Sequence, residues 1–241
     1  MGRDSSELLL MADFTAATSE ADLLQRAQPI GQALGMNHVL FGVQVARRNT
    51  EPLVHVVSGY PAAYDQMYRD RGFVRLDPTV PHCMTRDDAM VWDPADYKTP
   101  ESHEVLDEAR RFGLGYGLSI AVRRGTHAQL MFSMARDRPF ESQREIDHAI
   151  AGAKVLATIG LHVIENIVVP QLELAHRPHL TPRELECLKW LAQGKSNSVI
   201  GDILNLSEDT VEFHVKNLYK KLDVTTRLQA AIKALELKLV T

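Results

Sequence analysis

The sequence predicts an α+β fold in two domains: an N-terminal α/β/α sandwich with an antiparallel sheet, and a C-terminal all-α domain of four helices that contains a helix-turn-helix. Helix-like and strand-like patterns are mixed in the first part of the chain, whereas four helical patterns follow one another in the last part. Residues 170–179 lie between the two parts and carry two prolines and little periodicity. We therefore expect domains at residues 1–169 and 180–241, joined by a linker at 170–179.

Hydrophobic periodicity, with glycine and proline at the ends of segments, gives the N-terminal elements. Helices are expected over residues 6–16, 20–34, 61–72, 102–112 and 141–169. Strands are expected over 38–45, 52–57, 116–122 and 129–134, the last two as a hairpin around Arg124-Gly125-Thr126. Residues 76–98 contain three prolines and are expected to be irregular. About five antiparallel strands with helices on both faces follow from this order.

The C-terminal helices are predicted from their N-terminal caps. Thr181 precedes Pro182 and lies three residues before Glu184, which is the spacing of a capping box. Ser196 and Ser207 have the same capping role for the next two helices, and a fourth helix is expected over 226–238. Two short helices joined by a few residues form the helix-turn-helix arrangement.

Composition narrows the class of protein. The net charge is −4, but residues 177–241 hold 10 Lys and Arg against 8 Asp and Glu, so this part is at +2 and the remainder at −6. A basic domain on an acidic body is compatible with nucleic-acid binding. Cys83 and Cys187 are too few and too far apart for a disulfide framework or a metal cluster. We expect no signal peptide, no membrane span, no metal and no cofactor, and a cytoplasmic location.

The third C-terminal helix has an apolar stripe for packing and a charged face that would enter the major groove. A small helical domain with a solvated charged face has the same pattern. However, Leu180–Ala231 resembles the LuxR/GerE-type DNA-binding domain over its full length, through Leu180-Thr181, Gly194-Lys195-Ser196, Thr210-Val211 and Lys221-Leu222 among others. The resemblance implies double-stranded DNA as partner, with contacts from Lys195, Ser207, Thr210, Glu212, Phe213, Lys216, Asn217, Lys220, Lys221 and Arg227. Glu212 departs from the Lys or Asn common in relatives.

The predicted N-terminal domain contains a group of polar aromatic residues. Tyr60, Tyr64 and Tyr68 are four residues apart, and Asp77, Thr79, Trp92, Ser119 and Ser133 follow. An apolar pocket with a few fixed hydrogen-bonding groups is typical of a small-molecule site. A tyrosine stripe packed on a sheet, with Asp77 capping a turn, explains the same residues.

The segments YPAAY, MYRDRGF, LDPTVPHC and GLGYGLSI resemble the autoinducer-binding domain of the LuxR family, in its LasR-like branch, over most of residues 8–165. The resemblance implies an N-acyl-homoserine lactone as ligand. In this interpretation Asp77 accepts from the ligand amide, and Tyr60, with Ser133, donates to the amide carbonyl. Tyr68 and Trp92 form walls of the pocket, Thr79 and Ser119 offer hydroxyls, and Gly117 allows close backbone approach.

Two features bear on the ligand. Relatives usually have Trp where this chain has Tyr64, so the donor to the lactone carbonyl would lie at a different point. The side chains just before Ser133, those of Gln129, Leu130 and Met131, favour a medium acyl chain over a very long one. Neither feature fixes the ligand, and a receptor for another small molecule remains an alternative.

The sequence also bears on the oligomeric state and on two other functions. A homodimer is expected because an inverted repeat of DNA requires a two-fold protein. Small residues in 141–169 suit either a dimer contact or packing on the sheet. A phosphorylated receiver domain is disfavoured because its alternating βα units are missing. We expect no enzyme, such as a lactone hydrolase, because the sequence has no nucleophile elbow and no metal-spaced histidines.

Overall fold

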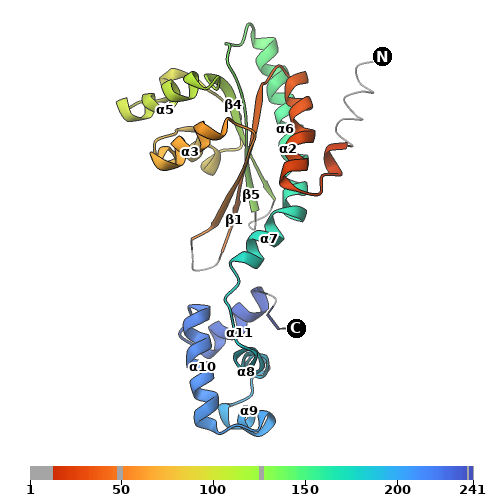
Figure 1. Ribbon diagram of the computed structural model, residues 1–241, viewed down its shortest axis with the longest axis vertical. Coiled ribbons are helices and arrows are strands. Elements are labelled where there is room, and N and C mark those ends of the chain that lie inside the picture. Colours follow the sequence, from red (N-terminus) through yellow and green to blue (C-terminus); the bar gives the residue numbers. More distant parts are fainter. Residues whose placement is uncertain (1–12, 48–50, 125–127, 238, 241) are drawn as a thin grey trace. The chain divides into compact units, whose positions relative to one another are not determined.

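Figure 1 shows the computed structural model, which describes residues 13–47, 51–124, 128–237 and 239–240. The chain divides into two compact units, Met1–Leu172 and Glu173–Thr241. The division falls inside the segment predicted as a linker. Each unit is described by itself below.

One antiparallel sheet of five strands forms the centre of the N-terminal unit. The strands are β1 (His38–Val45), β2 (Leu53–Ser58), β3 (Met90–Val91), β4 (Tyr116–Arg124) and β5 (Ala128–Arg136). Their order across the sheet is β2-β1-β5-β4-β3, and every neighbouring pair is antiparallel. The predicted antiparallel sheet is confirmed, and β4 and β5 are longer than the sequence pattern indicated.

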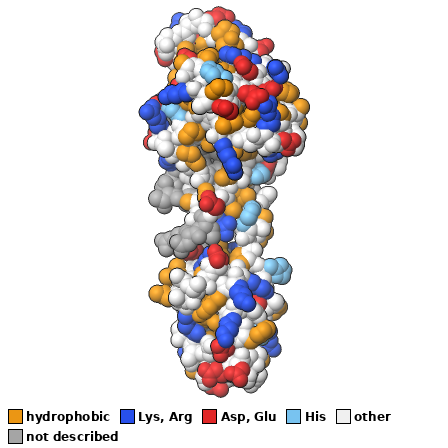
Figure 2. Space-filling model, turned by 90° about the vertical axis from the view of Figure 1, so that its left-hand side faces the viewer, with side chains coloured by type: hydrophobic (Ala, Val, Ile, Leu, Met, Phe, Trp, Pro, Cys, Tyr) orange, Lys and Arg blue, Asp and Glu red, His pale blue; other side chains and the backbone are white. Residues whose placement is uncertain are grey.

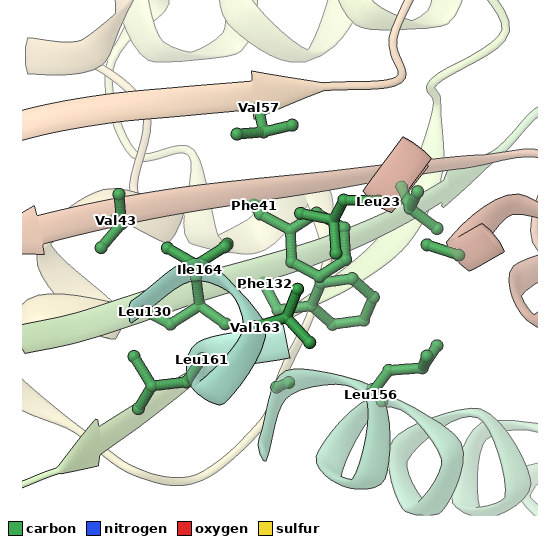
Figure 3. Packing of buried hydrophobic residues seen from close by; sticks show 14 of the residues in the cluster. Leu23, Phe41, Val43, Val57, Leu130, Phe132, Leu156, Leu161, Val163 and Ile164 are labelled. Atoms are coloured by element: carbon green, nitrogen blue, oxygen red, sulfur yellow. The ribbon is translucent and has the colours of Figure 1, made fainter. Parts of the chain in front are cut away.

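Helices α2 (Glu20–Ala33) and α6 (Gln143–Ile167) cover one face of the sheet, and the main hydrophobic core lies beneath them. Figure 3 shows Phe41 and Phe132 at its centre, with ring centroids 4.8 Å apart. A Cβ added at Gly160 of α6 would lie 2.8 Å from the Phe41 ring, so this glycine lets the helix approach the sheet closely. Several small residues of α6 therefore serve packing on the sheet.

Helix α6 is also long and apolar enough to pass a membrane-span test by length and composition. We expected no membrane span from the sequence. Its residues Ala149, Ala153, Leu156 and Ala157 are fully buried against the sheet and α2, which is the position of a core helix in a globular domain.

The other face of the sheet carries α3 (Ala62–Asp70), α4 (Thr79–Thr85) and α5 (Pro100–Arg111). The prediction that residues 76–98 are irregular was wrong, because this segment contains α4, β3 and a short 3-10 turn, Pro94–Asp96. Proline occupies the start of the segments rather than their interiors, where it is tolerated. Thr99 caps α5 through a capping box with Ser102, so the helix begins at Pro100, two residues before the predicted start.

Two predictions lie mostly outside the described residues. Of the helix predicted over 6–16, only Asp13–Thr15 can be seen to be helical, and the turn around Gly125 is not described. Pro170 does not end the helical region as expected. Helix α6 stops at Ile167, and α7 (Val169–Ala175) follows with Pro170 in its first turn, so the first part of the predicted linker is helical.

The C-terminal unit contains α8 (Pro182–Ala192), α9 (Asn197–Leu204), α10 (Glu208–Leu222) and α11 (Arg227–Glu236), which confirms the predicted helical domain. Thr181, Ser196 and Ser207 accept hydrogen bonds from backbone N–H groups of the first turns, as their positions predicted. Helices α8, α9 and α10 pack around Leu188, Ile200 and Val211. Asn205 adopts a left-handed conformation (φ 54°) between α9 and α10, which makes the tight turn of a helix-turn-helix.

Candidate functional site

A cavity of about 690 Å³ lies between the sheet and helices α3, α4 and α5. This volume is within the range of small-molecule sites. Seven of the eight residues predicted for the ligand site line it: Tyr60, Tyr64, Tyr68, Asp77, Thr79, Trp92 and Ser133. The structure therefore brings together residues that are up to 73 positions apart in the sequence.

Strand alternation builds the floor of the cavity. On β1, Val39, Phe41 and Val43 point into the core, whereas Leu40, Gly42 and Gln44 line the cavity on the opposite face. The register places Leu40 beside Ser58 of β2 and Ser133 of β5. Ser58 Oγ also accepts a hydrogen bond from Tyr60 N at 3.1 Å, so the row through Leu40 leads to the end of the cavity that Tyr60 lines, called the polar end below.

Asp77 is held by three hydrogen bonds from neighbouring residues. Its Oδ1 accepts from Thr79 N (2.9 Å) and Thr79 Oγ1 (2.7 Å), and its Oδ2 accepts from Tyr68 Oη at 2.9 Å. A carboxylate offers about four acceptor sites. One acceptor site of Asp77 is therefore left for a group in the cavity.

Burial raises the pKa of Asp77 above its ordinary value of 3.8, and the bonds from Thr79 and Tyr68 oppose this shift. Burial likewise raises the pKa values of Tyr60 and Tyr68, and the negative charge of Asp77 adds to both shifts. The phenols stay protonated at neutral pH and act as hydrogen-bond donors.

The tyrosines form a continuous wall that ends at Asp77. The ring centroids of Tyr60 and Tyr64 are 6.2 Å apart, and those of Tyr64 and Tyr68 are 5.8 Å apart. The hydroxyl of Tyr60 is buried and has no hydrogen-bond partner among the described residues. The donor of Tyr60 and the remaining acceptor site of Asp77 therefore lie along the same row of tyrosine rings.

The two predicted serines, Ser119 and Ser133, lie side by side on β4 and β5 of the sheet. Trp92 Nε1 donates to Ser119 Oγ at 2.9 Å, and the Ser119 and Ser133 hydroxyls are 2.8 Å apart. Ser133 lines the cavity, but Ser119 lies behind it and holds Trp92 in place. A Cβ added at Gly117 would lie 3.0 Å from the Trp92 ring, so Gly117 provides the close approach that the sequence predicted.

Several lining residues were not identified from the sequence. Tyr97 is buried at the cavity, and Val105 and Ala109 of α5 complete its wall. The helix pattern of 102–112 gave no sign of which face would meet the cavity. The alternation of β1, in contrast, contained the signal for Gly42 and Gln44, because both share a face with Leu40.

In the C-terminal unit, α10 presents most of the predicted DNA-binding residues on one side. Phe213 is 60% exposed, and Glu212, Lys216 and Lys220 are exposed beside it. Lys216 Nζ lies 2.6 Å from Glu212 Oε1, so the acidic residue offsets part of the basic charge of this helix. Figure 2 shows Lys and Arg interspersed with acidic side chains on the visible face of both units, so charge alone does not mark the DNA-binding surface.

Other predicted DNA contacts have partners within the unit. Lys221 Nζ donates to Glu184 Oε2 at 2.7 Å, and the Glu184 side chain is only 4% exposed, so the structure uses Lys221 in an internal ion pair. Arg227 donates to Asn197 Oδ1 at 3.0 Å and to the carbonyl of Lys195. Ser207 and Thr210 share a hydrogen bond of 2.8 Å at the start of α10, and Asn217 is partly buried on it.

Comparison with known families agrees with this geometry. Residues 19–163 match the autoinducer binding domain, and residues 178–234 match the bacterial regulatory proteins of the luxR family. The chain belongs to the LuxR family of transcriptional regulators. The sequence-based prediction of the family is confirmed, and this LuxR-family chain is a quorum-sensing transcriptional regulator with a small-molecule ligand and DNA as partners. Proteins of this family are regulators and not enzymes, as predicted.

Relatives match the LuxR-family chain along nearly its whole length. The transcriptional activator protein VanR of Vibrio anguillarum is 32% identical, with 95% of each chain covered. AnoR of Acinetobacter nosocomialis is 29% identical over 96% of this chain and 97% of its own. Among solved structures, Escherichia coli SdiA has the same fold, with a TM-score of 0.65, 24% identity and 98% of each chain covered.

Proposed function

We propose that this regulator is a cytoplasmic receptor for an N-acyl-homoserine lactone and that its ligand-bound homodimer binds an inverted repeat of DNA. One observation carries the ligand assignment. At one end of a mainly apolar cavity, Asp77 has an acceptor site left and Tyr60 has a buried donor without a partner in the described part of the chain. A secondary amide has one donor and one acceptor, which matches this pair.

The residues of this end would hold the lactone as follows. Asp77 accepts a hydrogen bond from the ligand amide N–H, and Tyr60, with Ser133, donates to the amide carbonyl. Tyr64 donates to the lactone carbonyl, since its ring lies between those of Tyr60 and Tyr68. The bond to Tyr60 would pair a buried hydroxyl that has no partner among the described residues, and unmet buried groups of this kind are costly.

The remaining site residues would orient these contacts. Tyr68 and Thr79 fix the Asp77 carboxylate, and Trp92 forms a wall against the lactone ring. Ser119 acts through Trp92 and Ser133, because it lies behind both.

Ligand binding would regulate the protein by mass action. The free N-terminal unit keeps the partly buried Asp77 carboxylate and, at Tyr60, a buried phenol with no partner among the described residues, which lowers its stability. A ligand that binds only the folded state adds about 2.7 kcal/mol at a concentration of 100 times its Kd. This gain is large against the marginal stability of a typical domain.

Exposed apolar residues support a homodimer in each unit. On α11, Leu228, Ile232 and Leu235 are 70%, 42% and 60% exposed and lie on one face through spacings of four and three. On α6, Ala151 and Val155 are exposed on the side away from the sheet. A second copy that covers these faces would bring two α10 helices to the two half-sites of an inverted repeat.

The ligand is tested by thermal unfolding of the full chain with N-decanoyl-homoserine lactone and with its ring-opened acid. The lactone is expected to raise the Tm in proportion to the logarithm of its concentration. The acid carries a negative charge to the buried Asp77 carboxylate and is expected to give a much smaller shift. Equal shifts from both compounds, or none from lactones of any chain length, would refute the proposal.

The DNA face is tested with two adjacent lysines of α10. Lys220→Ala is expected to reduce the slope of log K against log salt by about 0.9, the value for loss of one phosphate contact on B-DNA. Lys221→Ala is the matched control: its ammonium already pairs with Glu184, so the slope stays unchanged and the C-terminal unit becomes less stable. Filter binding at several salt concentrations gives the slopes, and equal effects of both variants would contradict this placement.

A further inference from the structure

The cavity continues along β1 well beyond the polar end that holds Tyr60 and Asp77. Leu40, Gly42 and Gln44 line it in turn, and Gln44 is paired with Val54 of β2 and Gln129 of β5. A strand advances about 3.3 Å per residue, so the row of Gln44 lies about 13 Å from the row of Leu40 and Ser133. Gln44 therefore marks the distal part of the cavity.

The cavity wall between these two rows is apolar, and a glycine at its middle leaves space next to the strand. Gly42 has no side chain, and its row neighbours are Val56 and Met131. Among the described residues, a Cβ added at Gly42 would meet only Met131 within 4 Å, at 3.8 Å, so there is room for a ligand atom next to this residue. An extended acyl chain can pass over Gly42 from the polar end towards Gln44.

The amide of Gln44 is unusual in this apolar part. Its Oε1 is buried and has no hydrogen-bond partner among the described residues. The neighbouring amide of Gln129 is already used, because its Nε2 donates to the carbonyl of Cys83, which also accepts from Arg123 at 2.8 Å. Of the two amides at this level, Gln44 is the one with a buried oxygen that the described residues leave without a hydrogen-bond donor.

We propose, resting on the receptor function above, that Gln44 recognises a hydroxyl group at the far end of the ligand's acyl chain. A hydroxyl both donates and accepts, so it can pair with the amide whichever of its two orientations the side chain takes. A plain alkyl end would leave Oε1 buried without a partner, which is unfavourable. The ligand class is thus an acyl-homoserine lactone with a distal hydroxyl.

The reach of the chain sets the compounds to test. Carbon–carbon bonds of about 1.5 Å advance an extended chain by about 1.3 Å each, so about ten bonds span the two rows. Matched pairs of eight, ten and twelve carbons are suitable, each with and without a hydroxyl on the last carbon. The preference for the hydroxyl should be greatest at the length that reaches Gln44.

Calorimetric titration of the full chain measures both members of each pair. We expect the wild type to bind the hydroxylated lactone about fivefold more tightly, the gain of one net hydrogen bond. Gln44→Met removes the amide at similar volume and should reverse this preference. Gln129→Met is the matched control: both affinities can fall together because this amide also holds α4 through the Cys83 carbonyl, but their ratio should stay near the wild-type value.

The outcomes separate this inference from the proposed function. A wild type that binds the plain lactone at least as tightly refutes the role of Gln44 and leaves the receptor function standing, even if Gln44→Met does not fold. An unchanged preference in Gln44→Met refutes it as well. If neither member of any pair binds, the receptor function fails and the inference fails with it.

Discussion

Replacing Gly117 with alanine is expected to lower the free energy of unfolding of the N-terminal unit by about 3 kcal/mol, the upper part of the range for overpacked sites. The added Cβ would lie 2.2 Å from the carbonyl oxygen of Met134 on β5 and 3.0 Å from the Trp92 ring. A backbone atom has little freedom to withdraw, so β4 and β5 must separate or Trp92 must leave the cavity. Urea denaturation of the full chain measures the loss.

Gly42→Ala is the matched control for this change. Gly42 lies on β1 of the same sheet, but an added Cβ there would meet nothing closer than 3.8 Å. Its effect on unfolding should stay within about 0.5 kcal/mol. Similar losses of unfolding free energy in the two variants would contradict this explanation. They would mean that the sheet needs glycine for backbone freedom and not to make room for Trp92.

The second large effect is expected for Asp77→Ala. Without the carboxylate, the ligand amide N–H is buried with no acceptor, so binding of the lactone should weaken by about 1–3 kcal/mol. Asp65→Ala is the control, because Asp65 also lines the cavity but its carboxylate accepts from Ser58 at 3.0 Å. Titration of both variants with the same lactone compares them, and equal affinities would remove Asp77 from the site.

The same variant has a pH signature in the absence of ligand. The pKa of Asp77 is raised in the folded state, so the folded chain holds this proton more tightly than the unfolded chain. Its contribution to stability is fully present below pH 3.8 and is lost as the pH rises through the folded pKa. Asp77→Ala lacks this loss, so its stability relative to the wild type should improve as the pH is raised to neutrality. Urea titrations over this pH range test the sign.

Local signals in the sequence were enough to predict much of the fold. The caps at Thr181, Ser196 and Ser207 fixed helix starts correctly because each cap satisfies backbone donors within its own turn. The segment 76–98 was misjudged for the opposite reason. Its helix α4 is short and is held by Arg123 and Gln129, which donate to the carbonyl of Cys83 from distant strands. Such tertiary support has no local pattern.

The candidate site divides in the same way. The tyrosine spacing and Asp77 pointed to the polar end, because a helix places residues four apart, here Tyr64 and Tyr68 of α3, on one side. In the sequence, Lys221 is a lysine like those that contact phosphates. Only the three-dimensional structure reveals its partner Glu184, 37 residues away. Gln44 was passed over because an amide in a strand has meaning only when its partners, or their lack, can be seen.

The two faces of β1 and β5 have a consequence for how such receptors diversify. Phe41 and Phe132 belong to the packed layer beneath α6, while an adjacent residue of each strand, Gly42 and Met131 respectively, lines the cavity. Mutations at alternate positions can thus change the size and polarity of the accepted signal while the folding core is left intact. A lineage can evolve to bind different ligands by exchanging a few residues on one side of a single layer of strands.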